Sequence, residues 1–175
     1  MYNGLLILGL NGCGKSTVGR IVAEKLGLFL MDAEDYYFPV PGDFSNSRTQ
    51  EEAHRLMEAD AAAHDGFVLC CVRCNISDAL LRQIRLAIIL RAPADVRALR
   101  IVQREEARFG SRVLPGGDLY ESQQRFRSFA AARTEETVDQ SLSRLCCPAV
   151  EIDASLSLES IANQIIQAYE KTLHR

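Results

Sequence analysis

The sequence has no surplus of positive charge and no long hydrophobic run. Its 20 lysines and arginines stand against 23 aspartates and glutamates, which gives a net charge of −3 and a pI near 5.7. Such a chain lacks the basic footprint of a nucleic-acid-binding protein, so we expect no nucleic-acid partner. The first apolar run, residues 5–8, is far shorter than a membrane span or a signal peptide core. We therefore expect a cytoplasmic protein without a membrane partner.

Lysine is scarce, and low-complexity tracts and internal repeats are absent. The 175 residues are 47% hydrophobic and 25% charged, which is enough for one packed core, so we expect residues 1–175 to form a single domain. Only three lysines accompany 17 arginines. Because the arginine guanidinium is a planar fork that matches phosphate geometry, this bias is consistent with phosphate recognition.

The cysteines allow two interpretations. Cys71 and Cys74 have the C-x-x-C spacing found in zinc sites. Cys70 and Cys71, however, lie in the apolar run "FVLCCV", where a reduced cysteine behaves as a small hydrophobic residue in a buried strand. We favour buried thiols and predict no metal ligand among the cysteines.

The stretch "LGLNGCGKST", residues 8–17, has the P-loop spacing G-x-x-x-x-G-K-[ST]. Its glycines let several backbone N–H groups turn toward one anion, and a helix beginning at Lys15 adds the positive end of its dipole. The Lys15 ammonium would reach the β- and γ-phosphates, and the Ser16 hydroxyl would bind Mg²⁺. The predicted nucleotide contacts in the loop are Gly9, Asn11, Gly12, Cys13, Gly14, Lys15, Ser16 and Thr17.

Five short apolar runs predict strands at residues 4–10, 29–32, 67–72, 86–92 and 149–154. Helical patterns separate most of them, and the runs are apolar throughout, as in strands covered on both faces. The sequence therefore predicts an α/β protein, a P-loop NTPase-type α/β/α sandwich around a five-stranded parallel sheet. Ligands of such sheets bind at the carboxyl ends of the strands.

The helical signals are a capping box, a glycine stop and apolar periodicity. Thr49 and Glu52 form a T-x-x-E capping box that opens one helix, and Gly110 ends another. Two more helices are predicted at residues 119–144 and 158–173.

Missing motifs separate the classes of P-loop protein. The chain has neither the N-K-x-D nor the D-x-x-G motif of GTPases. The predicted strand at residues 67–72 is followed by "RCN" without the carboxylate by which motor and AAA-type ATPases hold Mg²⁺ and activate water. Transfer to a bound acceptor is therefore favoured over work driven by ATP hydrolysis.

Along nearly its whole length the chain resembles the adenylate kinase and shikimate kinase-like group of small P-loop kinases. The resemblance rests on the P-loop, an acidic loop after the second strand, a helix behind it and an arginine-bearing segment before the last strand. It implies an ATP- and Mg²⁺-dependent kinase with an acceptor-binding insert at about residues 33–66 and a lid at about residues 108–118.

Acceptor residues follow from this resemblance. In "MDAEDYYFP", Asp32 takes the place of the family's acid near Mg²⁺ and Glu34 that of the acid on the acceptor hydroxyl, with Asp35 as a further candidate. Residues 72–75 stand in place of the glycine-rich loop of shikimate kinases. This difference argues against shikimate itself as the acceptor. Arg73 there would grip an acceptor phosphate, as an arginine does in adenylate kinases. The aromatic side chains of Tyr36, Tyr37 and Phe38 either stack on the acceptor or pack as a hinge.

Arginines spaced along one helix face define the expected lid. Arg104, Arg108 and Arg112 lie nearest the loop and are predicted to contact ATP and the acceptor, whereas Arg97 and Arg100 are expected on a solvated face. After the last strand, the backbone of Asp153, Ala154 and Ser155 is expected to face the adenine base. The alternative is a plain strand-to-helix turn capped by Ser157.

The sequence thus predicts phosphoryl transfer from ATP to a nucleoside, a nucleotide or a shikimate-like metabolite. Lys15 and the loop amides would hold the phosphates, Ser16 and Asp32 the Mg²⁺, and Glu34 or Asp35 the acceptor. Two alternatives stay open: a regulatory ATPase module activated by a protein partner, and a P-loop protein without catalysis. Either a monomer or a homodimer is compatible with the sequence, and ATP is not distinguished from GTP.

Overall fold

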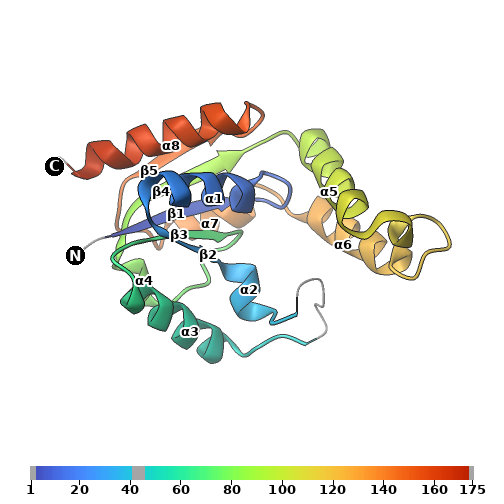
Figure 1. The fold of residues 1–175 in the computed structure, drawn as a ribbon, viewed down its shortest axis with the longest axis horizontal. Helices are drawn as coiled ribbons and strands as arrows, with labels where there is room; N and C mark the ends of the chain where they lie inside the picture. Colours follow the sequence, from blue (N-terminus) through green and yellow to red (C-terminus); the bar gives the residue numbers. More distant parts are fainter. Residues whose placement is uncertain (1–2, 41–45, 174–175) are drawn as a thin grey trace.

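A parallel sheet of five strands forms the middle layer of the protein (Figure 1). The computed structural model describes residues 3–40 and 46–173. The strand order is β2-β3-β1-β4-β5, and all neighbours are parallel. The strands are β1 (Gly4–Gly9), β2 (Phe29–Asp32), β3 (Phe67–Cys71), β4 (Ile84–Arg91) and β5 (Ala149–Asp153). This architecture confirms the predicted fold class.

The central strand is buried along its whole length. In β1 all six residues are buried, and Leu6 is in register with Leu69 of β3 and Ala87 of β4. β5 differs from the expectation, because four of its five residues are exposed. β5 is an edge strand, with no neighbouring strand on one side.

Helices flank the sheet and extend beyond it. They are α1 (Lys15–Leu26), α2 (Ala33–Tyr37), α3 (Gln50–Ala63), α4 (Asp78–Leu81), α5 (Ala94–Phe109), α6 (Tyr120–Ala132), α7 (Glu136–Leu142) and α8 (Leu158–Leu173), with a 3₁₀ turn η1 (Gly110–Val113). The capping box is confirmed: Thr49 Oγ1 accepts a hydrogen bond from the Glu52 amide at 3.2 Å, and Glu52 Oε2 accepts one from the Thr49 amide at 3.1 Å.

The single helix predicted at residues 119–144 is wrong, because the chain is interrupted between α6 and α7. Arg133 there is extended, with φ −77° and ψ 127°. Neither glycine nor proline marks the break. Instead, Arg133 reaches back to Asn11 in the P-loop, and Glu135 binds Arg91 at the end of β4. Long-range contacts therefore override the local helical pattern.

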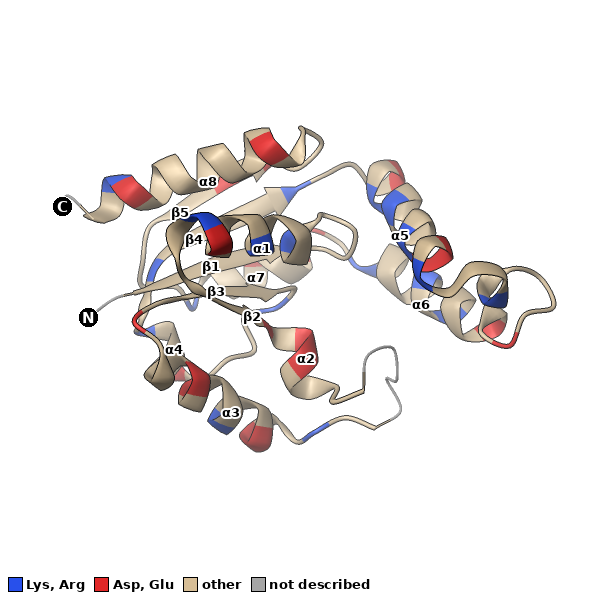
Figure 2. Cartoon of the chain, viewed as in Figure 1, with Lys and Arg blue, Asp and Glu red and all other residues tan. Residues whose placement is uncertain are grey.

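Helices α5 and α6, residues 94–132, form a hairpin that we call the arm, and it projects from the sheet at the right of Figure 1. An ion pair between the buried Glu105 and the half-buried Arg127 joins them, with 2.6 Å between Arg127 Nε and Glu105 Oε2. At the base, Arg91 forms ion pairs with Glu135, Asp139 and Glu151. Helix α5 carries four arginines and α6 carries two (Figure 2).

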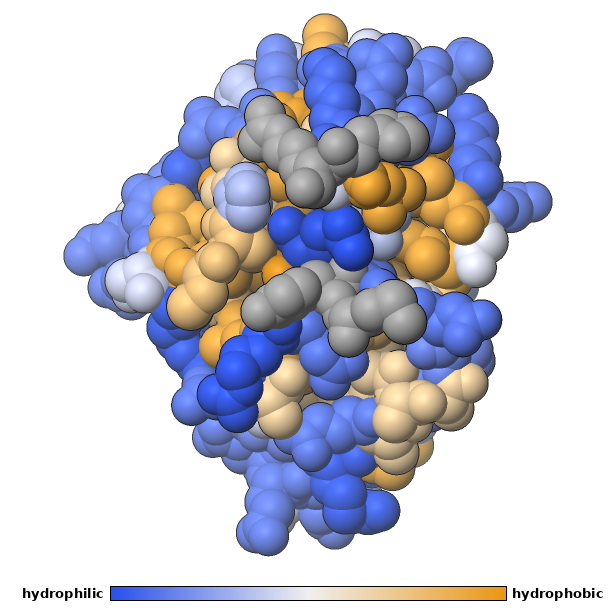
Figure 3. Space-filling view, turned by 90° about the vertical axis from the view of Figure 1, so that its left-hand side faces the viewer, coloured by the Kyte–Doolittle hydropathy of each residue, from blue (hydrophilic) through white to orange (hydrophobic). Residues whose placement is uncertain are grey.

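The opposite end of the molecule carries the two chain termini. On the face that Figure 3 shows, hydrophobic side chains form several separate patches among hydrophilic ones, and hydrophilic side chains make up most of the rim. Within the described ranges, no helix is both long enough and apolar enough to span a membrane.

Candidate active site

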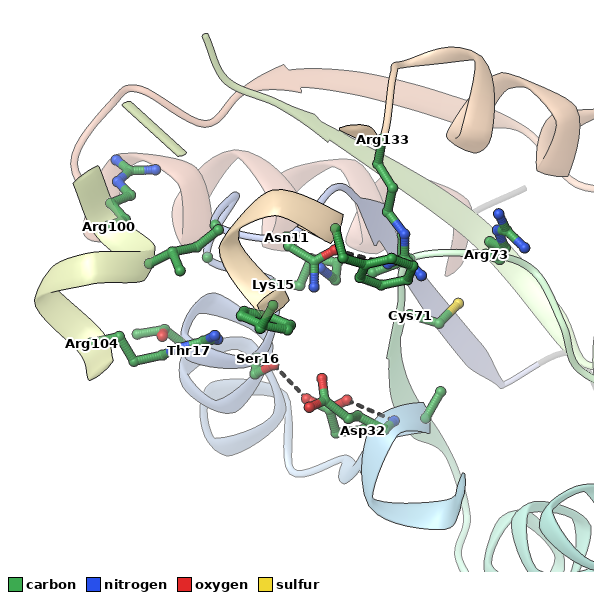
Figure 4. Close-up of a pocket in the computed structure, with 18 of the residues that line it drawn as sticks. Asn11, Lys15, Ser16, Thr17, Asp32, Cys71, Arg73, Arg100, Arg104 and Arg133 are labelled. Carbon is green, nitrogen blue, oxygen red and sulfur yellow. Dashed lines mark hydrogen bonds between the residues drawn. The ribbon is translucent and has the colours of Figure 1, made fainter. Parts of the chain in front are cut away.

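A cavity of about 1150 Å³ opens at the carboxyl ends of the strands, between the arm and α2 (Figure 4). Its floor is the loop between β1 and α1 together with the ends of β2 and β3. The inner faces of α5 and α6 and the segment before α8 complete the walls. The predicted position of the ligand at the carboxyl ends of the strands thus coincides with a cavity.

The loop at the floor has the backbone shape that a phosphate cradle needs. Gly12 and Gly14 have φ values of +86° and +88°, in the left-handed region that favours glycine. A Cβ at Gly12 would also lie 2.5 Å from the carbonyl oxygen of Arg97, so α5 leaves no room for a side chain there. Both the conformation and the packing therefore require glycine at position 12.

Lys15, Ser16 and Asp32 meet beside this loop. Lys15 Nζ donates a hydrogen bond to the Leu10 carbonyl at 3.2 Å, which folds the side chain back over the loop. The Ser16 hydroxyl donates to Asp32 Oδ2, while Asp32 Oδ1 accepts from the Glu34 amide at 3.1 Å and caps α2. A hydroxyl and a carboxylate oxygen in contact are ligands that Mg²⁺ prefers, so these residues fit the metal.

Most of the predicted loop contacts border the cavity. Its lining includes Asn11, Gly12, Gly14, Lys15, Ser16 and Thr17 but neither Gly9 nor Cys13. The Cys13 side chain is buried, and this burial raises the pKa of its thiol. Cys70 and Cys71 are buried in β3, as the apolar run predicted.

The two candidate acids after Asp32 differ in position. Glu34 lines the cavity, whereas Asp35 does not. Desolvation by the surrounding protein, and then the Asp32 carboxylate, raise the pKa of Glu34, although the charges of Arg104 and Lys15 oppose the shift. A carboxylate with a raised pKa at this place is suited to accept a proton from an acceptor hydroxyl. Glu34 is therefore the better-placed acid.

Tyr37 ties α2 to the loop that follows β3. Its hydroxyl donates to the Asn75 carbonyl at 2.9 Å and accepts from Asn75 Nδ2 at 2.9 Å. His54 Nε2 of α3 lies 3.3 Å from the same hydroxyl. Tyr37 and Arg73 both line the cavity. The hydroxyl of Tyr37 is thus engaged in packing between elements, in agreement with the hinge interpretation.

The arginines of the arm are distributed differently from the expectation. Arg97 and Arg100 were expected on a solvated face, which is wrong: Arg97 is 7% exposed, and Arg100 lines the cavity and donates to the Ala154 carbonyl at 2.7 Å. The cause is that α5 turns this part of its arginine stripe toward the sheet. The arginines that line the cavity are Arg73, Arg100, Arg104, Arg125 and Arg133.

Two arginines predicted for the lid lie outside this cavity lining. Arg112 forms an exposed ion pair with Asp118, with 2.7 Å between Nη2 and Oδ2. The Arg108 guanidinium lies 5.1 Å from the centre of the Phe109 ring. Residues 110–118 form the tip of the arm beyond the cavity, and the arginines that the arm contributes to the lining, Arg100, Arg104 and Arg125, come from its helices.

Arg125 and Arg133 were missed by the sequence interpretation. Both fall inside the predicted helix at residues 119–144, where nothing distinguishes them from solvated arginines. The general excess of arginine over lysine was the only available signal. The aromatic residues Phe126 and Phe129 of α6 also line the cavity.

The segment before α8 borders the cavity slightly later than predicted. Asp153 Oδ1 accepts from the Ser155 amide at 2.8 Å and closes a turn, and the lining begins at Leu156. Leu156, Ser157 and Leu158 border the cavity, with Ile101 in the same lining. Ser157 Oγ accepts from the Ser160 amide at 3.3 Å and caps this helix start, and the contact of Asp153, Ala154 and Ser155 with adenine stays a prediction.

Comparison with known sequences gives one match along the whole chain and several short ones. A family model described as an AAA domain matches residues 5–124. The "Uncharacterized protein YqaC" of Bacillus subtilis is 27% identical over 174 residues, which cover 95% of this chain and 97% of that protein. A "Probable gluconokinase" of Mus musculus is 54% identical over 33 residues, 19% of this chain and 18% of that protein. A shikimate kinase of Clostridium beijerinckii is 44% identical over 36 residues, 21% of each chain.

Solved structures share the fold at low sequence identity. A gluconokinase from Sinorhizobium meliloti 1021 has a TM-score of 0.53 at 14% identity, with 97% of this chain and 93% of that chain covered. An uncharacterized protein from Eubacterium ventriosum ATCC 27560 has a TM-score of 0.54 at 11% identity, with 98% and 99% covered. These matches confirm the resemblance to the small P-loop kinase group at the level of the fold.

Proposed function

Because the chain belongs to the AAA domain family and has the fold of small P-loop kinases, we propose that it transfers the γ-phosphoryl group of ATP to a small-molecule acceptor. One observation carries this proposal: the phosphate loop, the Ser16–Asp32 pair and the acid Glu34 all face a single cavity. At about 1150 Å³ the cavity exceeds the upper end of the usual range for small-molecule sites, roughly 1000 Å³, so it has room for two ligands.

The donor end of the cavity is the loop between β1 and α1. The amides of the loop and the start of α1 would hold the ATP phosphates, and Lys15 would neutralise their charge. Mg²⁺ held by Ser16 and Asp32 would supply further neutralisation of the β- and γ-phosphates. The apolar side chains of Ile101, Leu156 and Leu158 suit the base of the nucleotide.

The acceptor end lies beside α2 and the loop after β3. An acceptor hydroxyl oriented by Glu34 would attack the γ-phosphorus as the bond to the bridging oxygen of ADP breaks, and the hydroxyl proton would pass to the Glu34 carboxylate. Arg104 borders the same cavity and would stabilise charge on the phosphoryl group in transit. Closure of the arm would exclude water that competes with the acceptor.

The alternative of a partner-activated ATPase is weakened by the end of β3. Cys71, Val72 and Arg73 stand where hydrolysing AAA-type ATPases carry a carboxylate that activates water. Phosphoryl transfer to a bound acceptor needs a large cavity beside an acid. Hydrolysis by water alone does not need so large a cavity.

The test is ADP formation by purified protein with Mg-ATP and a panel of nucleosides, nucleoside monophosphates, sugar acids and shikimate. We expect one class of compound to stimulate ADP formation, and the stimulation to disappear in Lys15→Ala and Glu34→Gln. Lys25→Ala, at the other end of α1 from the cavity, is the matched control. Slow ADP formation that is indifferent to every compound and rises with a protein partner would overturn the kinase proposal.

A further inference from the structure

Asn75, in the loop after β3, borders the cavity and is held by side chains from two helices. Its carbonyl oxygen accepts a hydrogen bond from the Tyr37 hydroxyl of α2 at 2.9 Å and lies 3.2 Å from His54 Nε2 of α3. Its side-chain Oδ1 accepts from Gln50 Nε2 of α3 at 3.1 Å, and its Nδ2 donates to the Tyr37 hydroxyl at 2.9 Å. Both the backbone and the side-chain amide of this exposed residue are therefore fixed.

Helix α3 supplies two of these contacts from one face. Gln50 and His54 are four positions apart, so their side chains are neighbours on the helix surface. Helix α3 lies next to α2 (Figure 1), and the same face of α3 reaches the loop after β3. The first turns of α3 thus hold Asn75 at its backbone and at its side chain.

The contacts of His54 decide which of its ring nitrogens carries a hydrogen. A carbonyl oxygen only accepts hydrogen bonds, so the contact with the Asn75 carbonyl requires a hydrogen on His54 Nε2. The Tyr37 hydroxyl donates its single hydrogen to the same carbonyl, so at 3.3 Å it also accepts from His54 Nε2. One N–H shared between two acceptors explains why both of its distances are long. His54 therefore holds the Tyr37 hydroxyl and the Asn75 carbonyl together.

This network saturates the Tyr37 hydroxyl but not the Asn75 amide. The hydroxyl donates once and accepts from His54 Nε2 and Asn75 Nδ2, which uses its hydrogen and both of its lone pairs. Asn75 Nδ2 carries a second hydrogen and Oδ1 a second lone pair, and neither has a further hydrogen-bond partner among the described residues. The amide can therefore both donate to and accept from a molecule in the cavity.

The stability of the fold is a weak explanation for this network. Asn75 is exposed, so its hydrogen bonds replace bonds to water and contribute little to stability. A side chain that is ordered before its ligand arrives, however, lowers the entropic cost of binding. Tyr37 and Asn75 line the cavity, whereas His54 and the described remainder of α3 do not. His54 can therefore affect a ligand only through the residues that it holds.

We propose that Asn75 is a specificity-determining contact for an uncharged polar group of the acceptor, and that His54 positions Asn75 through its Nε2–H. The inference rests on the proposed function, because it concerns the acceptor of that reaction. An amide that both donates and accepts matches a hydroxyl, a carboxamide or the edge of a nucleobase. The acceptor accordingly carries such a group besides the hydroxyl that is phosphorylated.

The positioning can be tested by NMR spectroscopy of the ¹⁵N-labelled protein without an acceptor. We expect the His54 ring to carry hydrogen on Nε2, and the Asn75 Nδ2 resonances to move toward those of a free side chain in His54→Ala. His54→Gln should restore them, because the glutamine amide places an N–H close to the position of Nε2–H. His64→Ala, at the C-terminal end of α3 and away from the cavity, is the matched control. Asn75 resonances that are unchanged in His54→Ala, or hydrogen on Nδ1 alone, would overturn the positioning role.

Kinetics separate positioning from a general loss of structure. For the compound that stimulates ADP formation, we expect the acceptor KM to rise by about tenfold in His54→Ala and in Asn75→Ala, the effect of one lost hydrogen bond. The KM for ATP should stay unchanged, and His54→Gln should recover most of the loss. Thermal unfolding of each variant shows whether it is folded. A KM for ATP that rises in step with the acceptor KM would overturn the positioning role.

Tyr37→Phe tests whether the network acts as a unit. The substitution removes the hydroxyl and keeps the ring, so its effect on the acceptor KM should resemble that of His54→Ala. Because both variants break the same network, the double variant should be no worse than either single variant. Additive effects would place the Tyr37 hydroxyl on the acceptor and would overturn its assignment to the network.

A final titration distinguishes failure of this inference from failure of the kinase. Protein loaded with Mg²⁺ and a non-hydrolysable ATP analogue is titrated with adenosine, AMP, gluconate and shikimate while the Asn75 Nδ2 resonances are followed. Shifted resonances without stimulated ADP formation would overturn the kinase and support the Asn75 contact. Stimulated ADP formation with unshifted resonances and an unchanged KM in Asn75→Ala would overturn the contact and support the kinase. Neither response to any compound would overturn both.

Discussion

The Ser16 hydroxyl donates a hydrogen bond to the carboxylate of Asp32, so the first turn of α1 and the end of β2 meet at one point. Sixteen positions separate the two residues in the chain. They belong to strands and helices whose order places the carboxyl ends of β1, β3 and β2 side by side. The same Asp32 carboxylate caps α2, which carries Glu34 into the cavity. In the proposed function, Mg²⁺ binding and the placement of the acceptor acid would therefore both depend on the Asp32 side chain.

Removal of this carboxylate should weaken Mg²⁺ binding and catalysis together. In Asp32→Asn we expect kcat/KM to fall by roughly 10²–10³-fold, since a group that organises charge at the phosphates is lost. The apparent Mg²⁺ affinity should fall as well, as measured by titration of activity with Mg²⁺. Asp65→Asn, which lies before the amino end of β3 and does not line the cavity, is the control. An unchanged Mg²⁺ dependence in Asp32→Asn would show that the metal is held elsewhere.

Glu34→Gln should lower kcat by roughly 10²–10⁴-fold, because the amide cannot accept the hydroxyl proton. Desolvation and the Asp32 carboxylate raise the pKa of Glu34, and the base is active only when ionised. Activity should therefore fall as the pH decreases through a pKa above the ordinary glutamate value. The pH profile of kcat/KM, compared with that of Glu34→Gln, measures this fall in activity at low pH, the acid limb of the profile. Persistence of the limb in the variant would assign it to another group.

The same substitution should stabilise the folded protein at neutral pH. A carboxyl with a raised pKa binds its proton more tightly in the folded than in the unfolded state. Its contribution to stability is therefore present at low pH and is lost as the pH rises through the folded pKa. Glu34→Gln removes this unfavourable ionisation, so its Tm should exceed that of the wild type at pH 7, and the difference should vanish in acid. Thermal unfolding of both proteins at several pH values measures the difference in Tm at pH 7 and its loss in acid.

Removing Arg127, the half-buried partner of the buried Glu105 in the arm, should be strongly destabilising. Glu105 is 2% exposed, and its second oxygen has no hydrogen-bond partner among the described residues. Arg127→Ala leaves this carboxylate buried without its counter-charge, which costs about 3–5 kcal/mol of unfolding free energy. Replacing both partners by leucine should recover most of the loss. Denaturant unfolding of both variants tests this, and an Arg127→Ala variant as stable as the wild type would contradict it.

The spacing and periodicity of the sequence were sufficient for the parts of the protein that are governed locally. The glycines at positions 9 and 14, Lys15 and Ser16 predicted the phosphate loop, since their spacing is that of the loop whose backbone amides bind phosphate at the start of a helix. Continuous apolar runs predicted all five strands of the parallel sheet, and the Thr49–Glu52 pair predicted a helix start that the structure confirms. Each of these features depends on neighbours within a few positions in the chain.

The tertiary structure decided which side chains of the long helices face the cavity. The stretch at residues 119–144 reads as one helix, and the break at Arg133 exists because Asn11 and Arg91 bind the residues around it. Arg100 turns into the cavity and Arg112 stays outside it because the arm packs on the sheet through its base and not through its tip. A helical pattern records that arginines share a face, but only packing between distant segments determines what that face meets.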